Sequence, residues 1–384
     1  MTPVDAAALA GMFRHFAHHE FHGYSPLYER MALLLADRPD LARPLLAAGP
    51  AQRRAILYLA AVQYLLRTSA HGHPLAAYLP TLGGTRTVDD DLATALADLV
   101  STYRDELAAI CATRTTQTNE ARRAALLRPG FGRVTELVGG RPIHLVELGS
   151  SAGLLLISDR YPVEYTGPDG RHERYGPAGP PALTMRCEVA AGWPDPAAVD
   201  PRVAGRVGVD LHPVDAGDPA ATEWLRSCVW PEQTERLVRL DAALAEVARV
   251  RPRLVTGDMV GSLPGLLAEV DDDVVPCVFA SNAVTYLSGP DLGRLVEILA
   301  RTGARRDLAV VLNEASAVGA ELFLGRRPEQ AGPPGVLAVG LLTVVVWRGG
   351  RAHVEVLART SPHGQRMAWD PCRYDLEPPA GVGQ

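Results

Sequence analysis

The sequence predicts an α/β protein in which a parallel sheet closes on a final antiparallel strand, with a helical region before it and a lid-like insertion within it. Three observations lead to this fold class. Apolar residues recur at helical spacing up to about residue 130. Strand and helix patterns alternate from Pro142 onward. The last two strands flank a Gly-Gly pair, which is typical of an antiparallel hairpin. We therefore expect a helical region at 1–130 and a sheet domain at 131–384.

The first apolar strand, "IHLVEL", precedes an expected helix, and then the pattern breaks. Residues 162–205 are rich in proline and glycine. Within them, "VEYTGPDGRHERYG" predicts a hairpin and "ALTMRCEVAAG" predicts a further strand. We interpret this segment as an insertion that acts as a lid over a site.

After the insertion, four apolar segments alternate with helical ones. They are "RVGVDL", "RLVTGD", "VPCVFASNAV" and "DLAVVLNEAS". Such alternation predicts right-handed βαβ units and a parallel sheet. The closing "GLLTVVVWRGGRAHVEVLART" predicts the antiparallel pair.

Composition excludes several classes of function. The net charge of −6 argues against nucleic acid as a partner, and no apolar run reaches the roughly 20 residues of a membrane helix. The chain contains no lysine, so it lacks the Schiff-base residue of pyridoxal-phosphate enzymes and the phosphate-binding lysine of Walker loops. The five cysteines are scattered and suit free thiols in a reducing compartment. We expect a cytoplasmic protein with a small-molecule substrate and no metal; the sequence does not indicate the oligomeric state.

The turn after the first strand is the strongest candidate for a ligand site. It contains Glu147 and then Gly149, Ser151 and Gly153. A dinucleotide fingerprint needs a further glycine that this turn lacks. Ser151 can replace a glycine if its φ angle is negative. The alternative is a tight turn of an α/β protein that binds nothing.

This turn resembles motif I of class I S-adenosylmethionine-dependent methyltransferases. The resemblance implies a Rossmann-like methyltransferase sheet and S-adenosylmethionine as cofactor. It also implies that Asp210 binds the ribose, that Asp258 binds the adenine amino group and that Met259 packs on adenine. The full set of cofactor-binding residues implied is Glu147, Gly149, Ser150, Ser151, Gly153, Asp210, Asp258, Met259, Ser281 and Asn282.

A second resemblance covers essentially the whole chain. Segments such as "FAHHEFHGYSPLYERMA", "TQTNEARRAALL", "GVDLHPVDAGDP" and "PHGQRMAW" are similar to DUF2332, an actinobacterial family of unknown function. This resemblance implies no particular activity.

Two dense polar clusters are candidates for binding the acceptor. The first, at "TQTNEARR", is equally explained by a helix cap. The second, at "HHEFHGYSPLYE", contains several histidines, but solvation or packing explains it as well. We predict that the acceptor is acidic, because arginine pairs carboxylates in two bonds. The predicted substrate-binding residues are Gln117, Asn119, Glu120, Arg122, Tyr28, Glu29 and Tyr286.

A methyl acceptor needs a base if its nucleophile is an oxygen or nitrogen. His363, after the last expected strand, and Glu314, at the end of "LNEAS", are the predicted bases. Two alternatives to methyl transfer stay open. The first is another reaction, or a binding role, on the same fold. The second is a serine hydrolase with Ser151 as nucleophile of a Gly-x-Ser-x-Gly elbow.

Overall fold

The computed structural model describes residues 2–117, 119–194, 201–332 and 340–375. The chain forms two compact units. The helical unit comprises Met1–Asn119 and Gly217–Asp241, and the sheet unit comprises Glu120–Ala216 and Ala242–Gln384. The predicted boundary at residue 130 differs from this division because α6 (Ala124–Leu137) packs on strands of the sheet.

The helical unit contains six helices of nine or more residues that lie wholly within its described part. They are α1 (Pro3–Phe16), α2 (Pro26–Asp37), α3 (Ala55–Thr68), α4 (Asp91–Thr102), α5 (Arg104–Thr113) and α7 (Pro219–Ser227). The buried amide of Gln63 on α3 donates hydrogen bonds to the carbonyls of Ser227 and Val229, each at 2.7 Å. These bonds help to fix the 217–241 segment, which is distant in sequence, to the helical unit.

The sheet unit contains one mixed sheet of eleven strands in the order β3-β2-β4-β11-β10-β9-β8-β7-β1-β5-β6. The strands predicted after the insertion, and the β1 strand before it, are confirmed. The strand bounds are β1 (Ile143–Leu148), β2 (Val163–Thr166), β3 (His172–Tyr175), β4 (Met185–Ala191), β5 (Val203–Asp210), β6 (Arg253–Thr256), β7 (Val275–Ser281), β8 (Leu308–Ala315), β9 (Gly340–Arg348), β10 (Arg351–Thr360) and β11 (Arg366–Asp375).

Five neighbouring strands, β6-β5-β1-β7-β8, pair in parallel. In chain order they are strands 3-2-1-4-5 of a Rossmann-type sheet, so the predicted fold class is confirmed. The closing hairpin of β9 and β10 turns at Gly349 and Gly350, whose φ angles of 55° and 77° suit a type I′ turn. β9 and the final strand β11 run antiparallel to the parallel set. β11 was not predicted from the sequence.

The predicted insertion is present as strands β2, β3 and β4. β2 and β3 form the predicted hairpin, and β4 pairs with both β2 and β11. The insertion therefore extends the sheet at the edge opposite β6. Because main-chain hydrogen bonds hold it there, any lid movement has to involve its loops, and the lid role stays a prediction.

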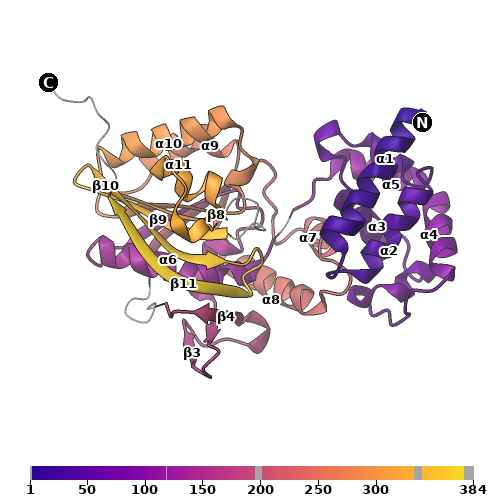
Figure 1. Ribbon diagram of the computed structural model, residues 1–384, viewed down its shortest axis with the longest axis horizontal. Helices are drawn as coiled ribbons and strands as arrows, with labels where there is room; N and C mark the ends of the chain where they lie inside the picture. The colour runs from indigo at the N-terminus through magenta and orange to yellow at the C-terminus, as the bar shows by residue number, and fades with distance from the viewer. Residues whose placement is uncertain (1, 118, 195–200, 333–339, 376–384) are drawn as a thin grey trace. The chain divides into compact units, whose positions relative to one another are not determined.

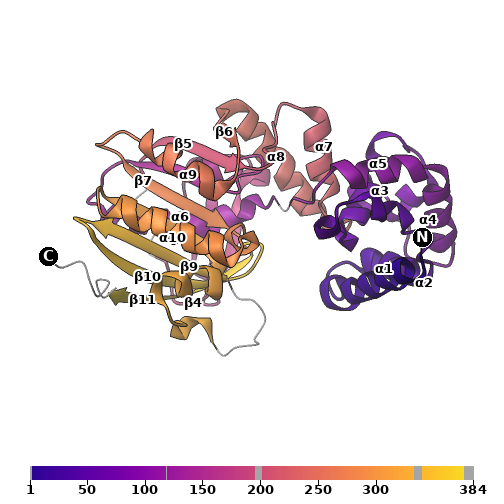
Figure 2. The same ribbon diagram turned by 90° about the horizontal axis from the view of Figure 1, so that it is seen from above.

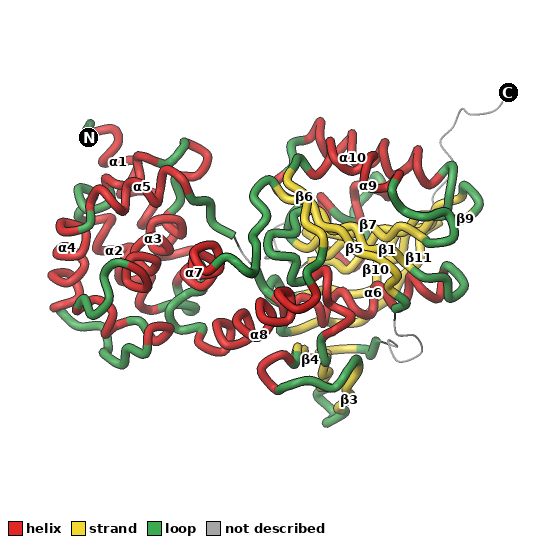
Figure 3. Tube along the Cα trace, turned by 180° about the vertical axis from the view of Figure 1, so that it is seen from behind, coloured by secondary structure: helices red, strands yellow, loops and turns green. Residues whose placement is uncertain are grey.

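Helices cover both faces of the parallel strands (Figures 1 and 2). On one face lie α9 (Met259–Ala268) and α10 (Gly289–Gly303), whose buried residues share a core with β1, β5, β7 and β8. On the other lies α6 (Figure 3). Among the described residues, no helix has both the length and the apolar character needed to cross a membrane.

Candidate functional site

The parallel strands end together at one edge of the sheet, and β1 occupies its topological switch point. After β1 and the insertion of β2 to β4, the chain forms β5 and β6 on one side of β1 and then β7 and β8 on the other. Ligands of doubly wound sheets bind at the carboxyl ends of the strands where the chain direction divides in this way. The strand ends of β1, β5 and β7 are therefore the candidate site.

The turn after β1 has a left-handed backbone at three positions. The φ angles are 74° at Gly149, 49° at Ser151 and 74° at Gly153. The condition that Ser151 keeps a negative φ is therefore not met. A Cβ atom on Gly149 would lie 2.6 Å from the Cβ of Ala283 in the turn after β7. The two turns touch, so Gly149 is required by packing as well as by its backbone angle.

The amides of this turn donate to oxygens of the protein itself. Gly149 and Ser150 donate to the carbonyl of Val209, at 2.9 and 3.2 Å, and Gly153 donates to the carbonyl of Ser150 at 2.7 Å. The Ser151 amide donates to Asp210 Oδ2 at 2.8 Å. These four donors are thus already engaged and do not form a cradle for phosphate.

The element after the turn is the short 3-10 helix η7 (Leu155–Arg160), not the helix expected there. Its backbone is non-helical at Ile157, with φ −108° and ψ 24°. A phosphate site at a helix N-terminus needs the aligned peptide dipoles of a regular helix. η7 does not supply them.

Two acids lie beside the turn. Asp210 binds the Ser151 amide with one oxygen and the His212 amide with the other, the latter at 2.8 Å. Glu147 is 3% exposed on β1, and burial together with the Asp210 charge raises the pKa of Glu147 well above its ordinary value. Glu147 is therefore a buried carboxyl group, and its predicted contact with a cofactor stays a prediction. Ser150 is also buried, against Gly208.

Asp258 and Met259 follow β6 at the same edge. Asp258 is the N-cap of α9, because its Oδ1 accepts a hydrogen bond from the Gly261 amide at 2.6 Å. The carboxylate is exposed, so its other oxygen can still accept from a ligand. Met259 is partly buried and packs against the core under α9. Its predicted contact with adenine stays a prediction.

Arg123, which was not among the predicted site residues, ties two segments, its own and the turn at Pro362, to the end of β7. The residue is 4% exposed. Nε donates to the carbonyl of Pro362 at 2.9 Å, and an Nη donates to the carbonyl of Ser281 at 3.2 Å. Asn282, at φ 55°, also donates to Pro362, at 3.3 Å. The missed signal was the pair of arginines in "NEARR", of which only Arg122 was chosen.

The predicted residues Glu120 and Arg122 do lie near this edge. Glu120 is buried, and its Oε1 accepts from the Arg122 amide at 3.0 Å, so it caps the 3-10 turn η6 (Ala121–Arg123). Glu120 itself is therefore the cap of this turn, and its predicted contact with a substrate stays a prediction. The turn between β10 and β11 packs on η6, since a Cβ atom on Gly364 would lie 2.7 Å from the Arg122 carbonyl group. His363, in this turn, is half-buried, and its role as a base stays a prediction.

Glu314 lies at the end of β8 and is fully buried. Its Oε1 accepts hydrogen bonds from the amides of Ala283 and Val284, at 2.7 and 3.1 Å. Burial raises the pKa of Glu314 to about 7, while the amides and the charge of Arg123 act in the opposite direction. A substrate cannot reach this carboxyl group, so the prediction of Glu314 as a base is not supported. Instead, Glu314 holds the turn after β7.

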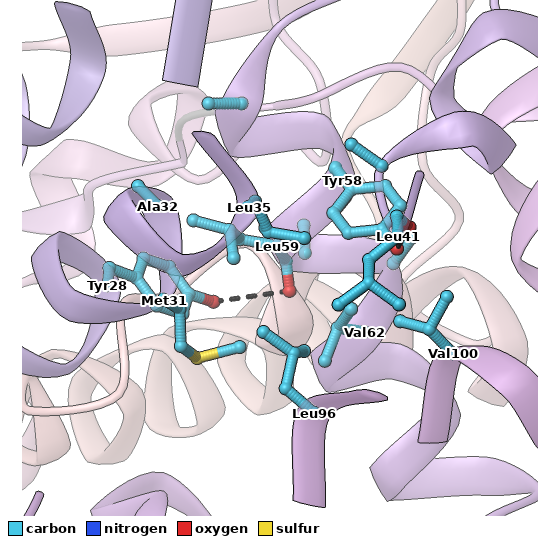
Figure 4. Close-up of a cluster of buried hydrophobic side chains, with 14 of the residues drawn as sticks. Tyr28, Met31, Ala32, Leu35, Leu41, Tyr58, Leu59, Val62, Leu96 and Val100 are labelled. Atoms are coloured by element: carbon cyan, nitrogen blue, oxygen red, sulfur yellow. Dashed lines mark hydrogen bonds between the residues drawn. The ribbon is translucent and has the colours of Figure 1, made fainter. Parts of the chain in front are cut away.

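Tyr28 is a core residue of the helical unit and not a binding residue. It is 2% exposed, and its hydroxyl donates to the Leu59 carbonyl at 3.4 Å (Figure 4). Glu29 pairs with His22 at 2.9 Å. Gln117 and Asn119 belong to the helical unit, so their predicted approach to the strand ends is untested.

Two large apolar side chains are exposed at the edge where the strands end. Leu211, after β5, is 60% exposed, and Tyr286, in η9 (Val284–Tyr286) after β7, is 69% exposed. A ligand that covers such side chains gains from removing apolar surface from water. Leu211 was not predicted as a site residue, although it directly follows Asp210.

A cavity of about 470 Å³ lies elsewhere in the sheet unit, between α6, β10 and β11. None of the predicted site residues lines it; its lining residues are Pro129, Arg133, Glu136, Glu355, Leu357, Trp369, Pro371, Cys372 and Arg373. The charged groups of this cavity are already paired with each other, since Arg133 pairs with Glu355 at 2.7 Å and with Glu136 at 2.9 Å. The strand ends are therefore the stronger candidate for the ligand site. Across the described ranges, no group of three or more His, Cys, Asp or Glu side chains could hold a metal ion.

Comparison with known proteins gives a family match and a similarity to solved structures. Residues 10–369 match the family described as "Uncharacterized protein conserved in bacteria (DUF2332)". A search of curated proteins finds no match. Among solved structures, the chain is similar to the sugar N-methyltransferase KedS8 from Streptoalloteichus sp ATCC 53650, with 13% identity over 77% of this chain and 84% of that chain. The TM-score is 0.22, so the fold assignment depends on the sheet topology and not on this neighbour.

Proposed function

This chain belongs to the DUF2332 family of uncharacterised bacterial proteins, and we propose that it binds S-adenosylmethionine at the ends of β1, β5 and β7 and transfers the methyl group to a small molecule. The observation that carries the proposal is the turn from Gly149 to Gly153. It lies at the switch point of the sheet, yet its amides donate to Val209, Ser150 and Asp210. A nucleotide pyrophosphate needs such amides free, whereas a nucleoside does not.

The charge beside the turn also favours this cofactor. Asp210 contributes a carboxylate at the switch point, which disfavours phosphate and suits a sulfonium cation. Each Asp210 oxygen accepts one amide bond and keeps a second lone-pair site for a ribose hydroxyl. Leu211 and the free oxygen of Asp258 are placed after the neighbouring strand ends and would serve the adenine.

When bound, S-adenosylmethionine supplies an activated methyl group, so the protein mainly has to align the acceptor and exclude water. His363 is the residue that we assign as base, because Arg123 and Asn282 fix its turn to the end of β7. Arg122 and Tyr286 are the proposed acceptor contacts. An arginine favours an acidic acceptor.

The test is a calorimetric titration of the full chain with S-adenosylmethionine, S-adenosylhomocysteine and NAD⁺. We expect saturable binding of the first two and none of NAD⁺. Glu297→Gln serves as a control, because this acid is 64% exposed on α10. Binding of NAD⁺ alone would refute the proposal. Cofactor binding without methyl transfer to any small acidic acceptor would favour the alternative of a binding role or a different reaction.

One observation keeps the serine hydrolase as a second candidate. Ser151 has a positive φ of 49° inside Gly-x-Ser-x-Gly, and a nucleophile elbow strains its serine in a similar place. The short η7 argues against it, because the elbow leads into a regular helix. A fluorophosphonate reagent should label the protein at Ser151 if it is a hydrolase. We expect that the reagent does not label Ser151, so that the wild type and Ser151→Ala give the same labelling.

A further inference from the structure

Glu314 is an acid in a place where an amide would be less costly. Its side chain is fully buried, and Oε1 accepts from two amides. Its Oε2 is also buried and has no hydrogen-bond partner among the described residues. A glutamine could accept the same two bonds without a charge to desolvate, and burying an unpaired charged oxygen is expensive. The acid therefore needs an explanation beyond packing.

The amides that Glu314 binds belong to the turn that touches the candidate cofactor turn. Ala283 is one of the two donors, and its Cβ is the atom that a side chain on Gly149 would meet at 2.6 Å. The preceding residue, Asn282, has a left-handed backbone at φ 55°, which costs about 1 kcal/mol outside glycine. Glu314 thus stabilises the strained turn after β7, and that turn packs against Gly149 in the turn after β1.

Two of the elements around Glu314 favour its ionised form. From η6, Arg123 faces it with a positive charge, and the turn after β7 faces it with its amides. From β9, Leu341 is its apolar cross-strand neighbour. From the segment after β8, a Cβ atom on Gly319 would lie 3.5 Å from the Cβ of Glu314. Burial favours the neutral form, and the balance sets its pKa at about 7.

We propose that Glu314 is a positioning residue whose proton controls the cofactor turn: ionised Glu314 holds Ala283 and Val284 against Gly149, and protonated Glu314 loosens them. The reason is linkage. Because the two amide bonds stabilise the ionised form, ionisation must strengthen those bonds by the same free energy. The effect on the turn does not depend on the ligand, whereas the consequence for affinity rests on the proposed function.

The direct test is hydrogen exchange of the full chain, followed by mass spectrometry of a peptide that spans Ser281–Tyr286. Rates are divided by the intrinsic rates at each pH. In the wild type, protection should rise about fivefold or more as the pH increases from 5.5 to 8.5, the factor expected when two neutral acceptor bonds become charge-assisted. Glu314→Gln should show no rise, and Glu297→Gln should behave as the wild type.

The pH dependence of global stability separates this proposal from a purely structural role of Glu314. Global unfolding transfers the acid to water, so global stability should fall between pH 5.5 and 8.5, whereas protection of the turn should rise. Wild-type protection that stays constant or falls would overturn the proposal, as would a rise that persists in Glu314→Gln. If Glu314→Gln does not fold, Arg123→Gln replaces it as the test variant. Because the charge of Arg123 lowers the pKa of Glu314, this variant should move the midpoint of the rise in protection to higher pH. The presence or absence of the rise in the wild type decides the proposal in either case.

Ligand titration separates this proposal from the cofactor assignment. S-adenosylhomocysteine should bind more tightly at pH 8 than at pH 6 to the wild type and equally at both to Glu314→Gln. If it binds at neither pH, the cofactor assignment fails and the exchange data still test the turn. If it binds with equal affinity at both and exchange shows no rise, the proton-controlled turn fails and the cofactor site stands.

Discussion

Asp210→Asn should weaken cofactor binding more than the loss of one ligand contact predicts. The wild-type carboxylate accepts the amides of Ser151 and His212, one on each oxygen, at 2.8 Å. An asparagine keeps one acceptor and turns an NH₂ group toward the other amide. Loss of a hydrogen bond to a charged acceptor costs about 1.5–3 kcal/mol, or about 10- to 150-fold in affinity. The cost comes from the distorted turn even where the ribose contact survives.

The assay is calorimetric titration with S-adenosylhomocysteine at pH 8, with thermal unfolding measured in parallel. We expect weaker binding and a slightly lower melting temperature for Asp210→Asn. Glu297→Gln removes an exposed acid of the same unit and should bind as the wild type does. Binding by Asp210→Asn within twofold of the wild type would refute the reasoning, because it would mean that the turn held by Asp210 is not the site.

Three further predictions follow from the same geometry. Gly149→Val should lower global stability by about 2–4 kcal/mol, because it adds backbone strain and a clash with Ala283, and thermal unfolding will show a normal midpoint if this is incorrect. The pKa of Glu314 is raised to about 7 in the folded state, so its stabilising contribution is present below about pH 4.5 and is lost as the pH rises through 7. Glu314→Gln should therefore remove about 3 kcal/mol of the pH dependence of the unfolding free energy, measured by denaturant titration. An unfolding free energy that depends on pH as in the wild type would contradict the assignment. Arg122→Ala should leave S-adenosylhomocysteine affinity within twofold while abolishing acceptor binding, and a parallel loss of both would place Arg122 in the cofactor site instead.

The sequence was informative wherever local pattern determines structure. Alternating apolar segments identified β1 and β5 to β10 because buried parallel strands and their helices have different periods. The Gly-Gly pair identified the last hairpin for the same local reason. The strand β11 was missed, since "RMAWDPCRY" contains a proline and lies beside a register shift between Val356 and Ala358.

Residue roles were harder to predict because they depend on burial. Tyr28 and Glu314 look like polar site residues in the sequence, yet both are buried, and neither burial is visible from neighbouring residues. For Arg123 the error was the reverse, because it was not predicted as a site residue and yet contacts the end of β7. It resembles its neighbour Arg122 in sequence, and only the fold shows that its guanidinium joins Pro362 and Ser281, which are more than 150 residues away. Long-range contacts of this kind have no local signal.

The central claim is that the strand ends around Gly149 and Asp210 hold the nucleoside of S-adenosylmethionine. The most direct measurement is a crystal structure of the full chain with S-adenosylhomocysteine. We predict density for the ligand at the ends of β1, β5 and β7, with the ribose hydroxyls within hydrogen-bonding distance of Asp210 and apolar contact with Leu211. Ligand found instead in the cavity lined by Arg133 and Trp369, with the Gly149 turn unliganded, would contradict the account.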